Sequence, residues 1–376
     1  MRAFVFTDKA LQRHAGQFVW LSLDVEKAEN AAYKKRYGVD ALPMYFVLDP
    51  KTEKAALRWV GGATVPQLQK ILADGLVAVR GGRREAETPL ARADRLYGEG
   101  SYEKAAAAYQ QALSNLPPSS SHYGRAIESL LYAFQKTEKY SDCARTADEA
   151  FSRLERSSSA ANVSATGLDC ALQMPDQDPV RPNRIATLKS DSEKIVAKPR
   201  PDIAADDISG VYEVLANERE WAKDEPGKKK ILQDRANFLE AAAARAKTPD
   251  ARAVFDSHRL GTYLELNEPE RAIPMLEGSE RDLRDDYNPP ARLAVAYRAM
   301  KRYDDALAAS DRALAKAYGP RKLGILQTRA DIYKEMGNVP AARKTMEQAV
   351  ELAESLPEGQ RSEKVIASVK KKLESL

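Results

Sequence analysis

The stretch Arg302-Tyr303-Asp304-Asp305-Ala306 decides the fold, because variants of it recur along the chain. Each copy joins a turn to a small residue on the helix that follows. The other copies are Gly100-Ser101-Tyr102-Glu103-Lys104-Ala105, Lys139-Tyr140-Ser141-Asp142-Cys143, Asn267-Glu268-Pro269-Glu270-Arg271-Ala272 and Gly337-Asn338-Val339-Pro340-Ala341-Ala342. The small residues Ala272, Ala306 and Ala342 are 34 and 36 positions apart. A small residue lets two antiparallel helices approach closely, so the pattern predicts stacked helical hairpins.

The residues around these turns follow the same spacing. In the first copy, small and aromatic residues that would pack between two helices stand at Ala93, Leu96, Gly100, Tyr102, Ala105, Tyr109, Ala112 and Pro117. The period and the packing positions resemble the tetratricopeptide repeat. This resemblance implies a helical superhelix over residues 89–376, with degenerate repeats at about 158–250, and a groove that holds a protein or peptide partner.

Composition agrees with a mostly α-helical fold. Of the 376 residues 30% are charged and 43% hydrophobic, and helix-forming residues dominate. The net charge of +4 comes from 59 basic and 55 acidic residues, a balance that argues against a nucleic-acid-binding stripe. No apolar run approaches the ~18 residues that a membrane span needs. We therefore expect no nucleic-acid partner and no membrane span.

Residues 1–79 have a different pattern. Apolar, β-rich runs predict strands at 18–25, 44–48 and 55–60, and amphipathic runs predict helices at 28–37 and 64–78. Gly38 suits the end of the first of these helices. Residues 80–88 contain glycine and many charges, which is typical of a linker.

The order of these elements and several of their residues resemble the second half of the thioredoxin family. The segment Tyr37-Gly38-Val39-Asp40-Ala41-Leu42-Pro43-Met44 is similar to the family's approach to a cis-proline, and Val60-Gly61-Gly62 to its last turn. The resemblance implies a small α/β domain over residues 1–79, a cis bond before Pro43, and substrate binding by Leu42, Pro43 and Met44. Catalytic residues are not carried over, because the family's Cys-x-x-Cys pair is absent.

The missing segment is contiguous. Met1-Arg2-Ala3-Phe4 resembles the stretch that follows the family's cysteine pair. Also missing is an early strand, which in the family's sheet lies between the strands that correspond to residues 18–25 and 44–48. Two strands without that neighbour would leave backbone groups unpaired. We therefore expect Met1 to be an internal methionine of a longer product; an in-frame stop codon immediately upstream would contradict this.

The remaining chemistry-bearing residues favour structural roles. Cys143 and Cys170 are not in a Cys-x-x-Cys pattern, so we expect no disulfide framework and two small, buried, apolar residues. His14, His122 and His258 are too scattered for a metal site, and we expect no cofactor.

Two functions stay open. The first is a thioredoxin-family protein whose repeats recruit partners, with thiol–disulfide oxidoreductase activity only if an upstream cysteine pair exists in the full-length product. The second is a non-catalytic interaction scaffold with a redox-inactive thioredoxin-like domain. The compartment also stays open: cytoplasmic as the sequence stands, or periplasmic or secreted if a signal lies upstream of Met1.

Overall fold

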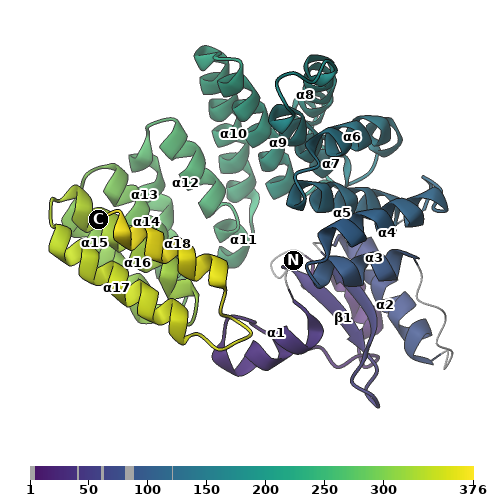
Figure 1. The fold of residues 1–376 in the computed structure, drawn as a ribbon, viewed down its shortest axis with the longest axis horizontal. Helices are drawn as coiled ribbons and strands as arrows, with labels where there is room; N and C mark the ends of the chain where they lie inside the picture. The colour runs from purple at the N-terminus through teal and green to yellow at the C-terminus, as the bar shows by residue number, and fades with distance from the viewer. Residues whose placement is uncertain (1–4, 40–41, 61–62, 81–88, 121) are drawn as a thin grey trace. The chain divides into compact units, whose positions relative to one another are not determined.

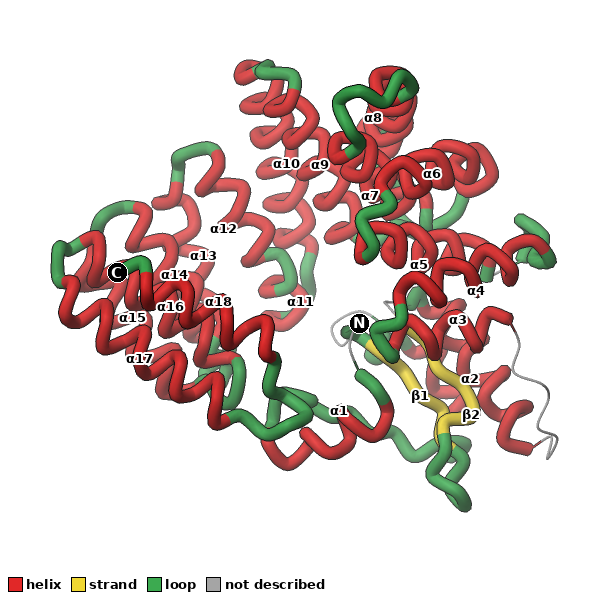
Figure 2. Tube along the Cα trace, viewed as in Figure 1, coloured by secondary structure: helices red, strands yellow, loops and turns green. Residues whose placement is uncertain are grey.

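A computed structural model describes residues 5–39, 42–60, 63–80, 89–120 and 122–376. The fold is mostly α-helical with one small sheet, as predicted (Figures 1 and 2). The chain divides into two compact units. Unit 1 comprises residues 1–15 and 39–239, and unit 2 comprises residues 16–38 and 240–376. The expectations for Met1–Phe4, for the turn at Gly61–Gly62 and for the linker at 81–88 lie outside the described residues.

The sheet of unit 1 contains two antiparallel strands, β1 (Met44–Leu48) and β2 (Ala55–Val60), within the described residues. Both strands were predicted. The apolar face of α2 (Val65–Arg80) also forms as predicted, with Leu68, Ile71 and Leu72 buried. Gly75 of α2 is needed for this packing, because a Cβ there would stand 2.5 Å from Val47 on β1.

The helices of unit 1 pack as consecutive antiparallel hairpins. Besides the short η1 (Lys9–His14), they are α3 (Pro89–Gly98), α4 (Tyr102–Ser114), α5 (Tyr123–Lys136), α6 (Tyr140–Leu154), α7 (Ala160–Gln173), α8 (Arg181–Ala197) and α9 (Ala205–Trp221). The small residues that define the repeat, Ala105 and Cys143, are fully buried, as the pattern requires. Gly167 of α7 shows how closely the helices approach, because a Cβ there would overlap Ala147 of α6.

Unit 2 continues the same architecture after α10 (Glu225–Arg245), the helix in which the unit boundary falls. Its further elements are α11 (Pro249–Ala253), α12 (Asp256–Glu265), η3 (Pro269–Arg271), α13 (Ala272–Asp282), α14 (Asn288–Ala299), α15 (Tyr303–Lys316), α16 (Arg321–Glu335), α17 (Val339–Ser355) and α18 (Glu363–Glu374). Ala272, Ala306 and Ala342, the repeat's small residues, are fully buried here too.

Residues 18–25 do not form the predicted strand. They have no helix or strand assignment, and Val19 and Leu21 are 89% and 75% exposed. An isolated strand leaves its backbone groups without a ladder, and in the described residues β1 pairs with β2 alone. The helix expected at 28–37 does form, as η2 (Ala28–Asn30) and α1 (Ala31–Tyr37). It ends at Gly38, whose φ of 59° is the left-handed conformation that favours glycine.

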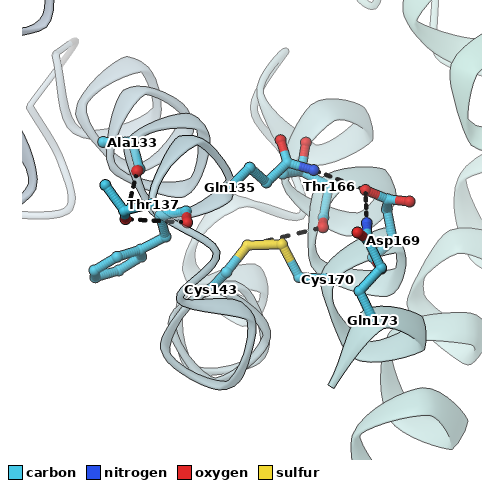
Figure 3. The surroundings of a disulfide bond; sticks show 9 residues. Ala133, Gln135, Thr137, Cys143, Thr166, Asp169, Cys170 and Gln173 are labelled. Atoms are coloured by element: carbon cyan, nitrogen blue, oxygen red, sulfur yellow. Dashed lines mark hydrogen bonds between the residues drawn. A yellow bond between two sulfur atoms is a disulfide. The ribbon is translucent and has the colours of Figure 1, made fainter. Parts of the chain in front are cut away.

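The two cysteines are buried as predicted, but the expectation of two separate thiols is wrong. Cys143 on α6 and Cys170 on α7 form a disulfide, and their Cα atoms are 6.0 Å apart (Figure 3). The helices on which they lie are packed directly against each other. Their separation of 27 residues in sequence gave no indication of this contact.

Candidate functional site

The residues that the sequence placed at a substrate site lie at the start of β1. The bond between Leu42 and Pro43 is cis, as the family resemblance implied. The Leu42 side chain is 66% exposed, and Met44 begins the strand opposite Val60. Substrate binding by Leu42, Pro43 and Met44 stays a prediction.

The repeats offer a second candidate, a face that sequence reasoning did not locate. From the hairpin α5–α6 onward, we call the first member of each hairpin its first helix: α5, α7 and α9 in unit 1, and α12, α14 and α16 in unit 2. Within each unit, successive first helices contact each other. In repeat proteins of this kind, such contacts build one continuous surface for a partner.

In unit 1 this surface is rich in half-buried polar groups. Its residues lie at helical spacing on three helices, and we call them the carboxylate face: Glu128, Tyr132 and Gln135 on α5, Asn162, Thr166 and Asp169 on α7, and Asp207 on α9. All seven are partly buried. Because residues three or four positions apart share one side of a helix, each helix presents its polar residues as a stripe.

Hydrogen bonds between amides and carboxylates join these stripes. The Gln135 side chain donates to Asp169 over 2.7 Å, and Gln173 donates to the same carboxylate over 2.9 Å (Figure 3). The Asn162 side chain donates to Glu128 over 3.4 Å. Both links between α5 and α7 join residues 34 positions apart. The repeat period was therefore the sequence signal that could have found them.

The carboxylates of this face are poorly solvated. Burial raises the pKa of Glu128 and of Asp169 above their usual values. Burial, with the charges of Asp206 and Glu128, raises the pKa of Asp207 to about 7. In the described part of the chain, no Lys or Arg forms an ion pair with Glu128, Asp169 or Asp207. The face can therefore accept a positively charged group.

On the corresponding face of unit 2, carboxylates of α16 form ion pairs with basic side chains of the same unit. Arg298 on α14 pairs with Glu335 and Asp331 on α16, at 2.7 and 3.2 Å. Lys372 of α18 also reaches Asp331, at 2.8 Å. Asp331 and Glu335 thus each have a cation of the same unit beside them, so these two carboxylates have less to offer a charged partner.

A buried ion pair fixes the helix on which the carboxylate face begins. Arg125 of α5 makes two parallel hydrogen bonds to Asp94 of α3, 2.8 and 2.9 Å long, and both residues are at most 5% exposed. Tyr109 of α4 donates to the same carboxylate over 2.7 Å. The guanidinium also lies 4.2 Å above the ring of Trp59 on β2, so the sheet and three helices meet at this pair.

In the described part of the chain, no three His, Cys, Asp or Glu side chains are placed to hold a metal ion. The helices described there are too short or too polar to cross a lipid bilayer.

A match to a family model supports the repeat assignment in part of unit 2. Residues 287–355, which span α14 to α17, match the tetratricopeptide repeat family. No curated protein matches the sequence. Among solved structures, a tetratricopeptide repeat protein from Parabacteroides merdae is similar over 76% of this chain and 97% of its own, at 10% identity and a TM-score of 0.40.

Two further solved structures are similar to this chain. BtubC from P. vanneervenii is similar over 70% of this chain and 94% of its own, at 16% identity and a TM-score of 0.37. Yeast Tom70 is similar over 82% of this chain and 92% of its own, at 11% identity and a TM-score of 0.16.

Proposed function

We propose that this chain is a protein-binding scaffold whose tetratricopeptide repeats hold a basic segment of a partner on the carboxylate face of unit 1. The observation that carries the proposal is the set of half-buried carboxylates whose hydrogen-bond donors are neutral amides. Lysine or arginine from a partner would supply the missing charge through charge-assisted hydrogen bonds. Tyr132 adds an aromatic ring beside the acids, which suits the aliphatic stem or the cation of such a side chain.

A binding measurement tests this proposal. A fluorescein-labelled peptide of alternating lysine and alanine should bind the full chain, and a matched peptide with glutamate in place of lysine should not. Asp207→Asn and Asp169→Asn should each weaken binding about ten-fold, because each removes a charge and keeps the side-chain shape. Glu335→Gln on the neutralised face of unit 2 is the matched control and should leave the affinity unchanged. Equal weakening by all three substitutions would contradict the proposal.

We propose a second, non-catalytic role for residues 39–80. The antiparallel pair β1–β2 followed by α2 supports a thioredoxin-like origin of this region, with Leu42, Pro43 and Met44 as a peptide-contacting edge. The cysteines of this chain, Cys143 and Cys170, are buried and bonded to each other. Dithiol exchange would need a cysteine pair in a longer product. The chain as given should therefore not reduce insulin disulfides, and turnover in that assay would overturn the non-catalytic assignment.

A further inference from the structure

The loops at one end of unit 2 hold a segment whose contacts with them join residues 294 to 335 positions apart in sequence. One loop comprises residues 317–320, before α16, and the other comprises residues 356–362, between α17 and α18. We call the two together the loop site. Residues 24–37 lie against it and form the docked segment, with α1 beside the turn that precedes α18 (Figure 1).

Charge recognition comes from the first loop and the start of α16. Arg321 pairs with Asp24 at 2.9 Å and donates from Nε to Glu26 over 2.5 Å. Tyr318 donates its hydroxyl to Asp24. Lys27 lies 5.9 Å from the centre of the Tyr318 ring, so the aromatic side chain is in contact with the segment on both sides of Glu26. The loop site therefore binds two carboxylates, Asp24 and Glu26, that are separated by one residue.

Backbone recognition comes from the second loop. The side-chain amide of Gln360, which is only 7% exposed, donates to the carbonyl oxygens of Val25 and Lys27 over 3.0 and 2.8 Å. These bonds do not depend on side-chain identity, and they fix the turn that places the two acids. An exposed ion pair between Lys35 and Glu358, 2.7 Å long, continues the contact along α1.

Two glycines let the backbones meet. A Cβ on Gly359 would overlap the carbonyl oxygen of Ala31, and a Cβ on Gly319 would stand 2.5 Å from that of Glu26. Gly319 also has a φ of +50°, which favours glycine. The charged contacts, the backbone hydrogen bonds and the close packing at the two glycines are therefore all made to the same docked segment.

We propose that the loop site is a binding site for an acidic turn, and that the chain keeps it occupied with its own docked segment as an autoinhibitory contact. The occupant's requirements follow from the contacts: two carboxylates separated by one residue, two backbone carbonyls that Gln360 can reach, and a helix that begins a few residues later. A partner segment of the same chemistry binds only when the docked segment is released. This proposal is independent of the carboxylate face, which lies in unit 1.

Cross-linking tests the contact within the full chain. Lys35→Cys with Glu358→Cys introduces two exposed thiols, which a short bis-maleimide should join within one monomer. Adding Gly359→Ala should lower the cross-linked fraction at least about five-fold, since the new Cβ collides with the docked segment. Gly324→Ala on α16 is the matched control, because a Cβ there meets open space. Equal yields in the two variants, or cross-links between monomers, would overturn the proposal.

A peptide in trans tests the site itself. The double variant Asp24→Arg with Glu26→Arg should release the docked segment and leave the loop site open. A fluorescein-labelled peptide of residues 20–37 should bind this variant at least about ten-fold more tightly than the unmodified chain, by fluorescence anisotropy. Adding Arg321→Glu should abolish that binding, whereas adding Arg302→Glu, an exposed arginine at the opposite end of α15 from the loop site, should not. Equal binding by the unmodified and double-variant chains would overturn the proposal, and circular dichroism would confirm that each variant is folded.

Discussion

The first-helix faces of the two units both carry carboxylates, and these carboxylates have different partners. In unit 1, the neutral amides of Gln135 and Asn162 donate to Asp169 and Glu128, and neither carboxylate has an ion-pair partner among the described residues. In unit 2, Arg298 neutralises two carboxylates at once. A neutral amide donates a hydrogen bond to a carboxylate without compensating its negative charge, whereas a guanidinium donates hydrogen bonds and also compensates the charge. One repeat architecture thus gives one face that is open to a cation and one that is already paired.

The largest effect should come from the ion pair beneath the carboxylate face. Arg125→Ala leaves the Asp94 carboxylate buried without its cation, and should lower the free energy of unfolding of unit 1 by about 3–5 kcal/mol. Arg298→Ala in unit 2 removes a half-exposed arginine and should cost about 1 kcal/mol or less. Urea unfolding followed by circular dichroism measures both. Similar losses of unfolding free energy in the two variants would show that the burial of the Arg125–Asp94 pair does not make it more important for stability than the ion pairs of Arg298.

The second-largest loss of stability should come from removing the disulfide. A bond that closes a loop of this length stabilises a folded chain by about 3–4 kcal/mol in the chain-entropy model. Cys143→Ala with Cys170→Ala should therefore lower the stability of unit 1 and leave the transition of unit 2 unchanged. A reductant should have the same effect on the unmodified chain and none on the double variant. A loss confined to unit 2 would contradict this assignment.

The smallest effect concerns pH. The folded-state pKa of Asp207 is raised from 3.8 to about 7, so between those values the folded chain binds more protons than the unfolded chain. Asp207 therefore makes unit 1 less stable as pH rises through that window. A rise in pKa from 3.8 to about 7 corresponds to about 4 kcal/mol in full. Because Asp207 keeps part of its surface in water, we expect Asp207→Asn to be more stable than the unmodified chain by about 2 kcal/mol at pH 8 and nearly equal to it near pH 4. Denaturant titrations at the two pH values measure the difference, and an equal stability of the two chains at pH 8 would contradict the prediction.

Local patterns predicted much of the fold and little of the site. Gly38, β1, β2 and the buried face of α2 follow from short-range periodicity and capping, which the sequence displays directly. Residues 18–25 have the composition of a strand but lack the partner that a strand requires. Composition alone could not reveal this, because strand pairing is a long-range property.

The site depends on the phase of the helices relative to one another. That phase decides whether Glu128 and Asn162 face each other, and no single helix determines it. The 34-residue spacing of Gln135 and Asp169 was visible in the sequence, but it gains meaning only once α5 and α7 are known to be neighbours. The disulfide was missed for the same reason, since it too joins neighbouring helices.

The bond between Cys143 and Cys170 also bears on how the array opens. Stacked repeats exchange their amide hydrogens through local openings, because each repeat is held only by its neighbours. A covalent link between α6 and α7 ties the second hairpin to the third, so neither can fray alone. Asp169 lies on α7, which carries one of the two cysteines, and Gln135 lies on α5, the hairpin partner of α6. The disulfide should therefore suppress local opening of the helices that form the carboxylate face.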